Sequence, residues 1–544
     1  MVRAGNGQGE RLDGKRLAAR CLMVQGTSSH VGKSVLVAAL CRIFARDGWR
    51  VAPFKSQNMS LNSYVTDEGG EMGRAQVLQA QAAGVRPHTD MNPLLLKPAS
   101  GGRVQVVLEG RAVGHLDAMA YRERVRDLLP RVLAALGRLR ATHDIVVMEG
   151  AGSPAEVNLK EGDIANMHMA READAPVILV GDIDRGGVFA SLVGTLELLE
   201  PWERELVRGL VINKFRGERE FLGDGLRWLE ERTGKAVLGV IPYLEDLALE
   251  EEDSVAVEAA RRRGAGREEG PGCLDIAVLR LPYISNTTDF QPLEAETGVR
   301  VRYVARASDL GVPDAVVIPG SKDTASDLSF LEESGLAAAT VRLASWRVPV
   351  VGICGGYQML GRSISDPGGV EGNAARREGL GLLPVDTVMA RRKSTHLVKA
   401  VARKEVPWLG LGPSRPPLYG YEIHMGRTRV EGEAPLLIVE RGGSAARVED
   451  GAVHGELPVF GCYLHGLFEN RFLREAFLDF LRGRRGMEPV GVGEDWSRQR
   501  EGQLDLLADE VRAALDVDGI YSMLGMERPG RGAGRSVRRG ARRQ

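Results

Sequence analysis

The sequence has few cysteines, almost no net charge and no long hydrophobic run, and each of these features disfavours a class of protein. Its five cysteines are widely spread and form no CxxC pair, which disfavours a disulfide framework and a structural zinc site. The 72 Lys and Arg residues nearly balance the 73 Asp and Glu residues, so no overall charge favours nucleic acid or an anionic membrane as a partner. No run of about 18 apolar residues could span a bilayer, and no signal segment begins the chain, so we expect a cytoplasmic protein without membrane insertion.

The length and the changes in composition along the chain indicate more than one domain. A chain of 544 residues is too long for one hydrophobic core, and its 43% hydrophobic and 27% charged residues are typical of a globular protein. From about residue 250, opposed charge blocks and glycines replace apolar periodicity, which indicates a linker. We therefore expect a disordered N-terminus at 1–15, a front domain at 16–249, a linker at 250–272, a rear domain at 273–525 and a disordered basic tail at 526–544.

Residues 21–40, CLMVQGTSSHVGKSVLVAAL, combine an apolar strand, a loop rich in Gly, Ser and Thr, and an apolar helix. This order is typical of a phosphate cradle, because glycine lets the backbone wrap around an anion and the helix N-terminus directs N–H groups at it. Lys33 would add a positive charge, and Ser34 could bind Mg²⁺ through its hydroxyl. The pattern predicts a site for a nucleoside triphosphate, specifically ATP, with contacts from Gly26, Thr27, Gly32, Lys33 and Ser34.

Further apolar stretches alternate with helical patterns through the first half of the chain. We expect strands near 51–54, 145–148, 176–181, 210–216 and 237–241. Helices are expected at 72–83 and at 117–139, the latter broken near Pro130, and a hairpin is expected at 104–113. Strands separated by helices are typical of a doubly wound, mostly parallel α/β domain with right-handed crossovers.

Polar side chains follow several of these strands, at the edge where parallel sheets bind their ligands. Glu149 comes directly after the strand at 145–148 and precedes glycine, which is where a second Mg²⁺ contact belongs in a phosphate-loop ATPase. Asn213 carries a donor and an acceptor on one amide, which suits recognition of the adenine edge. The sequence therefore predicts a metal contact at Glu149 and a base contact at Asn213.

Other polar residues at these strand ends have more than one interpretation. Lys55, Gln57 and Asn58 follow the strand at 51–54, and they could meet a substrate or a nucleotide or belong to a solvated loop. Asp182 and its charged neighbours could bind metal or orient a substrate, or could form a local salt bridge. The sequence leaves these alternatives open.

A second α/β pattern begins after the linker. Strands are expected at 275–281, 299–304, 315–318 and 348–353, and helices at 471–481 and 503–515. Residues 350–361, VVGICGGYQMLG, read as a strand, a tight turn and a helix with Cys354 at the apex. Glycines on both sides permit the strained turn of a nucleophile elbow, and a helix N-terminus behind the sulfur favours the thiolate. Cys354 is therefore the expected nucleophile.

A thiolate nucleophile needs a partner for proton transfer. His465 ends an apolar run and precedes glycine, which favours it as the base, whereas its rival His424 could orient substrate or close an interdomain face. Backbone N–H groups would hold the oxyanion, with donors at Gly355 and in the turn at Gly320 and Ser321.

The cysteine elbow with a downstream histidine resembles a class I, or triad-type, glutamine amidotransferase domain. Most such domains carry His-x-Glu, whereas Leu467 stands two positions after His465, which leaves the residue that orients the histidine open, with Glu469 as a candidate. The branch of cobyric acid and cobyrinate diamide synthases shares this departure. The chain resembles that branch over nearly its whole length.

The front half of the chain is similar to dethiobiotin synthetase and its relatives, which share the five-residue spacing between Gly26 and Gly32. Three other segments resemble the cobyric acid synthase family in particular. They are QNMSLNS at 57–63, LPYISNTTDF at 281–290 and GYEIHMG at 420–426.

The resemblance implies an enzyme with two centres. Cys354 would attack the amide of glutamine, which Tyr357 and Gln358 would help to bind, and His465 would protonate the departing ammonia. ATP and Mg²⁺ at the first centre would convert a carboxylate to an acyl phosphate that ammonia attacks. Ammonia is mostly ammonium at neutral pH and is lost to water, so a shielded passage between the domains is expected.

The substrate that the resemblance implies is adenosylcobyrinic acid a,c-diamide, a corrinoid amidated at its b, d, e and g carboxylates. The nearest alternative is a cobyrinic acid a,c-diamide synthase or a related two-module amidotransferase-ligase. A regulatory phosphate-loop ATPase with a noncatalytic rear domain is an alternative from a different class. The intact elbow at Cys354 counts against it.

Overall fold

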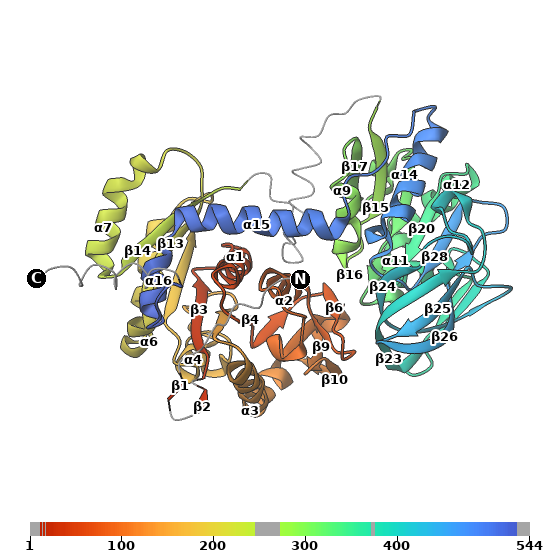
Figure 1. Ribbon diagram of the computed structural model, residues 1–544. Coiled ribbons are helices and arrows are strands. Elements are labelled where there is room, and N and C mark those ends of the chain that lie inside the picture. The colour runs from red at the N-terminus through yellow and green to blue at the C-terminus, as the bar shows by residue number, and fades with distance from the viewer. Residues whose placement is uncertain (1–10, 13–14, 17, 245–271, 372–375, 530–544) are drawn as a thin grey trace, which may run out of the picture.

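The computed structural model describes residues 11–12, 15–16, 18–244, 272–371 and 376–529. The predicted linker at 250–272 lies almost wholly outside the described residues. Most residues of the predicted disordered termini, at 1–15 and 526–544, also lie outside them. Figure 1 shows two halves, each built on its own sheet and joined along one side. Within the described residues, no helix has the length and apolar character needed to cross a membrane.

The front half is built on a six-stranded sheet in which every neighbouring pair of strands is parallel. Its strands, in spatial order, are β14 (Ala236–Pro242), β13 (Val207–Phe215), β12 (Val177–Asp182), β3 (Arg20–Gly26), β11 (Ile145–Glu149) and β4 (Val51–Phe54). The central strands are apolar and fully buried because helices cover both faces of the sheet. The predicted doubly wound parallel domain is confirmed.

Helices connect these strands along the chain. They are α1 (Lys33–Arg46), α2 (Arg74–Ala82), α3 (Ala118–Thr142), α4 (Met167–Glu172), α5 (Val188–Leu198), α6 (Pro201–Leu206) and α7 (Gly223–Thr233). The predicted break near Pro130 is wrong, because α3 continues through this residue as one helix. Proline removes one backbone donor, but the buried side chains Val125, Val132 and Leu136 hold both halves of the helix against the core.

A smaller sheet lies between the main sheet of the front half and the rear half (Figure 1). It contains β5 (Gln57–Met59), β8 (Leu94–Pro98), β9 (Arg103–Leu108) and β10 (Arg111–Asp117), and a separate two-stranded sheet pairs β6 (Ser63–Val65) with β7 (Glu71–Gly73). The predicted hairpin is confirmed, since β9 and β10 pair antiparallel around Glu109 and Gly110. Because strand side chains alternate, β9 turns Val106 to the front core and Gln105 to the opposite face.

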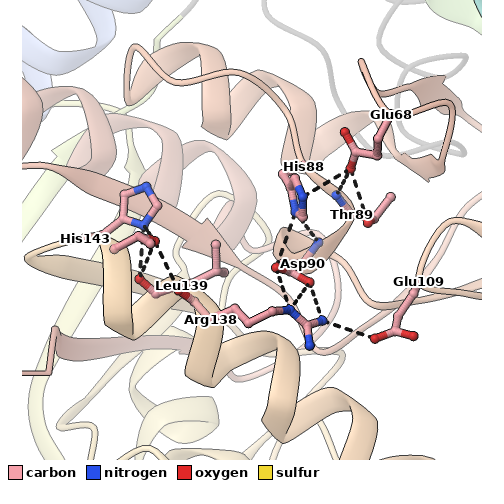
Figure 2. A network of polar contacts seen from close by, with 9 residues as sticks. Glu68, His88, Thr89, Asp90, Glu109, Arg138, Leu139 and His143 are labelled. Atoms are coloured by element: carbon pink, nitrogen blue, oxygen red, sulfur yellow. Dashed lines mark hydrogen bonds and ion pairs between the residues drawn. The ribbon is translucent and has the colours of Figure 1, made fainter. Parts of the chain in front are cut away.

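Ion pairs fix this hairpin to α3. Figure 2 shows the Arg138 guanidinium between two carboxylates, 2.5 Å from Asp90 Oδ1 and 3.1 Å from Glu109 Oε1. His88 accepts the N–H of Asp90 through Nδ1 and lies 3.5 Å from Glu68 through Nε2. These contacts join the short helix η1 (Thr89–Met91), the hairpin turn and α3 into one support for the small sheet.

The rear half repeats the α/β plan. Its main sheet runs β17 (Val299–Val304), β15 (Leu274–Leu279), β18 (Ala315–Ile318), β20 (Val350–Ile353), β28 (Val459–Cys462) and β27 (Ala452–Val453), and only β27 is antiparallel to its neighbour. The long strands β23 (Val385–Ala402) and β24 (Leu418–Val430) pair antiparallel in a second sheet. The predicted second α/β domain is thereby confirmed behind the phosphate-loop domain.

The C-terminal helices do not all stay with the rear half. The helix α14 (Arg471–Arg484) packs in the rear core, whereas α15 (Trp496–Ala514) extends across the front half, and α16 (Val517–Met523) follows it (Figure 1). Leu507 and Val511 of α15 share a core with α1, and Arg42 of α1 bonds Asp505 at 2.8 Å. The predicted rear domain at 273–525 therefore contains helices that complete the core of the front half.

Candidate active site

The phosphate loop joins β3 to α1 and folds closely around its own lysine. Gly32 has a φ of 98°, a left-handed conformation that favours glycine. A Cβ on Gly26 would come within 2.4 Å of Val31 and 3.1 Å of Lys33 Nζ, so only glycine leaves room for the loop. Lys33 Nζ donates to the carbonyls of Ser28 at 2.9 Å and Gly152 at 3.0 Å, which places its charge in the loop.

Glu149 lies at the centre of a buried group next to this loop. It is 1% exposed, and its carboxylate accepts from Ser34 Oγ at 2.8 Å and from Lys55 Nζ at 2.7 Å. Two amides of α2 also donate to it, Gln79 at 2.5 Å and Gln76 at 3.3 Å. The structure thus brings together three residues that the sequence singled out separately, at the carboxyl ends of β4 and β11 and the start of α1.

The other polar residues predicted at this edge lie around that group. Asn58 Nδ2 donates to Gln76 Oε1 at 2.8 Å, and Gln57 accepts from the hydroxyl of Tyr121 at 2.5 Å. Asn213 Nδ2 donates to the carbonyl of Val31 at 2.8 Å, so its amide contacts the phosphate loop itself.

Asp182 takes part in ion pairs. Its Oδ2 lies 2.9 Å from Lys214 Nζ and 3.9 Å from Arg185 Nε. Of the alternatives that the sequence left open for Asp182, the structure shows the local salt bridge.

The predicted elbow forms in the rear half between β20 and α13 (Gly355–Leu360), with Cys354 5% exposed. Cys354 has a φ of 53°, a strained conformation for a residue with a side chain. A Cβ on Gly356 would meet the carbonyl oxygen of Ile318 at 2.0 Å, and one on Gly355 would meet Ser321 N at 2.8 Å. The small residues therefore let the turn pack against the loop that follows β18.

Cys354 and His465, which lies three residues after β28, both contact β24: the thiol donates to the carbonyl of Ile423 at 3.5 Å, and the backbone of His465 pairs with that of Tyr421 two residues earlier. His465 Nδ1 lies 2.7 Å from Oδ2 of Asp289, whose Oδ1 accepts the N–H of Gly466 at 2.8 Å. Burial alone lowers the pKa of His465, but the charges of Asp289 and Cys354 and the hydrogen bond to Asp289 outweigh it and raise the pKa to about 10. The imidazole is thus held as imidazolium at neutral pH.

Sequence reasoning missed Asp289. The candidate considered for orienting His465 was Glu469, but the structure places that carboxylate 3.6 Å from Arg74 of the front half. Asp289 belongs to η5 (Thr287–Phe290), far from His465 in the chain. The signal available was a single acid in the polar segment SNTTDF, and nothing in the sequence linked it to the histidine.

A pocket beside Cys354 contains most of the residues that the sequence assigned to glutamine and the oxyanion. Ser321, Gly355 and Gln358 line it, and a Cβ on Gly320 would come within 3.0 Å of His465. Tyr357 does not line it; its ring packs edge-on against Tyr463.

His424 also lines this pocket, as does a set of charged and amide side chains that sequence reasoning missed. The ring of His424 stacks on Tyr463, whereas His465 is the histidine that pairs with Asp289. The further lining residues are Lys97 and Gln105 from the front half and Lys322, Glu371 and Lys393 from the rear half. The pocket is thus lined by side chains of both halves.

Comparisons with known proteins match both halves. Residues 22–256 match the family described as CobQ/CobB/MinD/ParA nucleotide binding domain, and residues 275–472 match the CobB/CobQ-like glutamine amidotransferase domain. The cobyric acid synthase of Moorella thermoacetica is 51% identical over 513 residues, which cover 94% of this chain and 98% of the relative. That of Pelotomaculum thermopropionicum is 52% identical over 535 residues, covering 95% and 99%. That of Sorangium cellulosum is 51% identical over 533 residues, covering 94% and 100%.

Proposed function

This chain belongs to the cobyric acid synthase family, and from that premise we propose how its two buried centres share one reaction. The enzyme is a glutamine-dependent amide-forming ligase of cobalamin biosynthesis. The amidotransferase half uses glutamine, and the nucleotide-binding half serves the ligase step. Each half thus carries out its own step of the reaction.

The placement of Cys354 and His465 against the same strand, with Asp289 holding the histidine, carries the proposal for the rear centre. The thiolate attacks the side-chain amide carbon of glutamine, and the resulting oxyanion accepts from the N–H of Gly355 and the turn at Gly320 and Ser321. His465 gives its proton to the departing nitrogen, so ammonia leaves and a thioester forms on Cys354. Water, deprotonated by His465, then releases glutamate and restores the thiol.

The front centre would activate the acceptor acid. Lys33 and the N–H groups of the phosphate loop bind the phosphates of ATP, and a substrate carboxylate attacks the γ-phosphorus to give an acyl phosphate and ADP. Ser34 and Glu149 present adjacent oxygen atoms, which are the ligands that Mg²⁺ prefers, and the pair fits this ion. Mg²⁺ bound there would neutralise phosphate charge. Asn213, which holds the loop through Val31, would meet the adenine.

The acceptor that we propose is adenosylcobyrinic acid a,c-diamide, amidated at its b, d, e and g carboxylates. Lys55, next to Glu149, would attract the reacting carboxylate, and Gln57 and Asn58, which follow the same strand, would contact the same molecule. In each cycle ammonia displaces phosphate from the acyl phosphate, forming one amide bond.

Ammonia must travel between the two centres without meeting bulk water. The glutamine pocket supports such a transfer because it is lined by Cys354 of the rear half and also by Lys97 and Gln105 of the front half. We propose that ammonia enters the front half past these two side chains.

A mass spectrum of the corrinoid after incubation with ATP, Mg²⁺ and glutamine tests this function. Four successive amidations of the a,c-diamide are expected, with glutamate, ADP and phosphate released in step. Turnover of cobyrinic acid instead would identify an a,c-diamide synthase. The absence of both turnover and glutamate release would contradict the proposed function.

A further inference from the structure

We propose that three consecutive residues of the front half, Asn62, Ser63 and Tyr64, position the histidine of the rear centre, and that α2 links them to Glu149. The inference rests on the proposed function, because it takes His465 and Glu149 as the working groups of the two centres. It adds a physical connection through which occupancy of the front site changes the rate of glutamine hydrolysis. Each step of that connection is a contact between buried or partly buried residues, through side chains or backbone.

Asn62 and Ser63 hold the segment that carries the partners of His465. Asn62 Oδ1 accepts the N–H of Thr287 at 2.9 Å, and the N–H of Ser63 donates to Asn286 Oδ1 at 2.9 Å. The other end of the Asn286 amide, Nδ2, lies 3.3 Å from both ring nitrogens of His465. Asn286 has a φ of 56°, a left-handed conformation that its neighbours must maintain. The front half supplies two of the hydrogen bonds that do so.

Tyr64 reaches the same histidine through a second aromatic ring. Its ring meets Tyr421 edge-on, with centroids 4.8 Å apart. Tyr421, which is 2% exposed, stacks on the imidazole of His465 with centroids 5.2 Å apart and an interplanar angle of 16°. The backbones of these two residues also exchange hydrogen bonds of 2.9 and 3.2 Å. A change at Tyr64 therefore reaches the face of the imidazole through Tyr421, and a change at Ser63 reaches its ring nitrogens through Asn286.

Helix α2 joins this contact region to the front centre. Its first residue, Arg74, donates its N–H to the carbonyl of Asn62 at 3.2 Å and places its guanidinium 4.9 Å from the centre of the Tyr64 ring. Two and five residues further along, Gln76 and Gln79 donate to Glu149. A helix of nine residues is about 13 Å long. The residues of both centres therefore contact the same short helix, and a shift at one end of it can be passed to the other end.

Binding at the front site must disturb this arrangement at Glu149. Ser34 Oγ and Lys55 Nζ now bond the carboxylate, and the proposed metal and phosphate groups would take over those contacts. A carboxylate that changes partners changes its hydrogen bonds to Gln76 and Gln79, and the shift passes along α2 to Arg74 and Tyr64. The alignment of His465 thus depends on what the front site holds.

The test compares full-length Tyr64→Leu and Asn62→Ala with Tyr64→Phe and with a control, Tyr419→Ala. Tyr419 lies on the same strand as Tyr421, and its side chain is 59% exposed. Glutamate release is measured with and without Mg²⁺ and a nonhydrolysable ATP analogue, as kcat and KM for glutamine. Amidation driven by added ammonium is measured on the same samples.

In the parent protein, the analogue with Mg²⁺ should change kcat for glutamate release by about fivefold or more, the usual range of coupling between sites. Tyr64→Leu and Asn62→Ala should lower kcat at unchanged KM and lose the response, while they keep ammonium-driven amidation. Tyr64→Phe should behave as the parent because the ring, not the hydroxyl, makes the contact, and Tyr419→Ala should do so as well.

Three results would overturn the inference. In the first, glutamate release by the parent protein is the same with and without the analogue; in the second, Tyr64→Leu and Asn62→Ala respond to the analogue as the parent does. In the third, the variants lose ammonium-driven amidation as much as they lose glutamate release, which would indicate a general structural defect. Failure of the proposed function is distinguishable, since the parent itself would then neither release glutamate nor amidate the corrinoid.

Discussion

Asp289 Oδ2 lies 2.7 Å from His465 Nδ1, although 176 positions separate the two residues in the chain. Both side chains are almost fully buried, at 2% and 1% exposure. The carboxylate also accepts the backbone N–H of Gly466, so it fixes both the ring and the strand end that carries it. The acid that orients this histidine therefore comes from the start of the rear half, whereas Leu467 occupies the position that would hold an acid in a His-x-Glu motif.

Replacing Asp289 with Asn should lower kcat for glutamate release by about 100-fold, with little change in KM for glutamine. The amide keeps the shape of the carboxylate but loses the charge that raises the pKa of His465, so burial lowers that pKa and the ring loses its proton. Stopped assays of glutamate at several pH values check this, and the alkaline limit of activity should move to lower pH. Asp479→Asn, on the outer side of α14, is the control. A variant with the parent's pH profile would contradict the role of Asp289.

The ion pair of His465 should also make the stability of the protein depend on pH. The folded pKa of about 10 lies above the ordinary value of 6.5, so the stabilisation is complete below pH 6.5 and is lost as pH rises through about 10. Denaturant unfolding between pH 7 and pH 10 should show a decline that is shallower in Asp289→Asn than in the parent. Equal slopes would mean that the pair does not titrate in this range.

Cys354→Ala should separate the two activities of the enzyme. Amidation with glutamine should fall by about 1,000-fold or more because the nucleophile is gone, whereas amidation with added ammonium should persist. Cys462→Ala, in the neighbouring strand β28, is a matched control for loss of a buried thiol. Loss of both activities in Cys354→Ala would show that the thiol has another task.

Local patterns predicted the parts of this fold whose signals lie in consecutive residues. The strand, loop and helix around Lys33 and the elbow around Cys354 each lie within 20 residues, and both form as expected. The pairing of Asp289 with His465 and the packing of α15 on α1 depend on contacts between residues 176 and 463 positions apart. Hydrophobic periodicity predicts that such a helix forms, but it does not predict which domain the apolar face of the helix packs against.

Lys33→Ala should lower the rate of product formation by about 100-fold or more with either nitrogen source, because the charge that stabilises the transferred phosphoryl group is lost. Glutamate release in the absence of nucleotide should remain. Quantifying the amidated corrinoid with ammonium as the nitrogen source measures the effect. Lys404→Ala, an exposed lysine of the rear half, serves as the control. Retained amidation in Lys33→Ala would disprove the phosphate-loop assignment.

Gln105→Trp tests whether ammonia crosses between the halves at the shared pocket. Gln105 is 2% exposed and lines the pocket of Cys354 from the front half. The indole ring of tryptophan is larger than the glutamine side chain and would narrow the proposed ammonia route past Lys97. Glutamate release and ammonium-driven amidation should both continue, while amide formed per glutamate released should fall well below the parent's ratio because ammonia escapes to solvent. Val113→Trp is a matched control on the same hairpin, since its side chain is 60% exposed. A parent-like ratio in Gln105→Trp would place the route elsewhere, because ammonia that never passes this side chain is indifferent to its size.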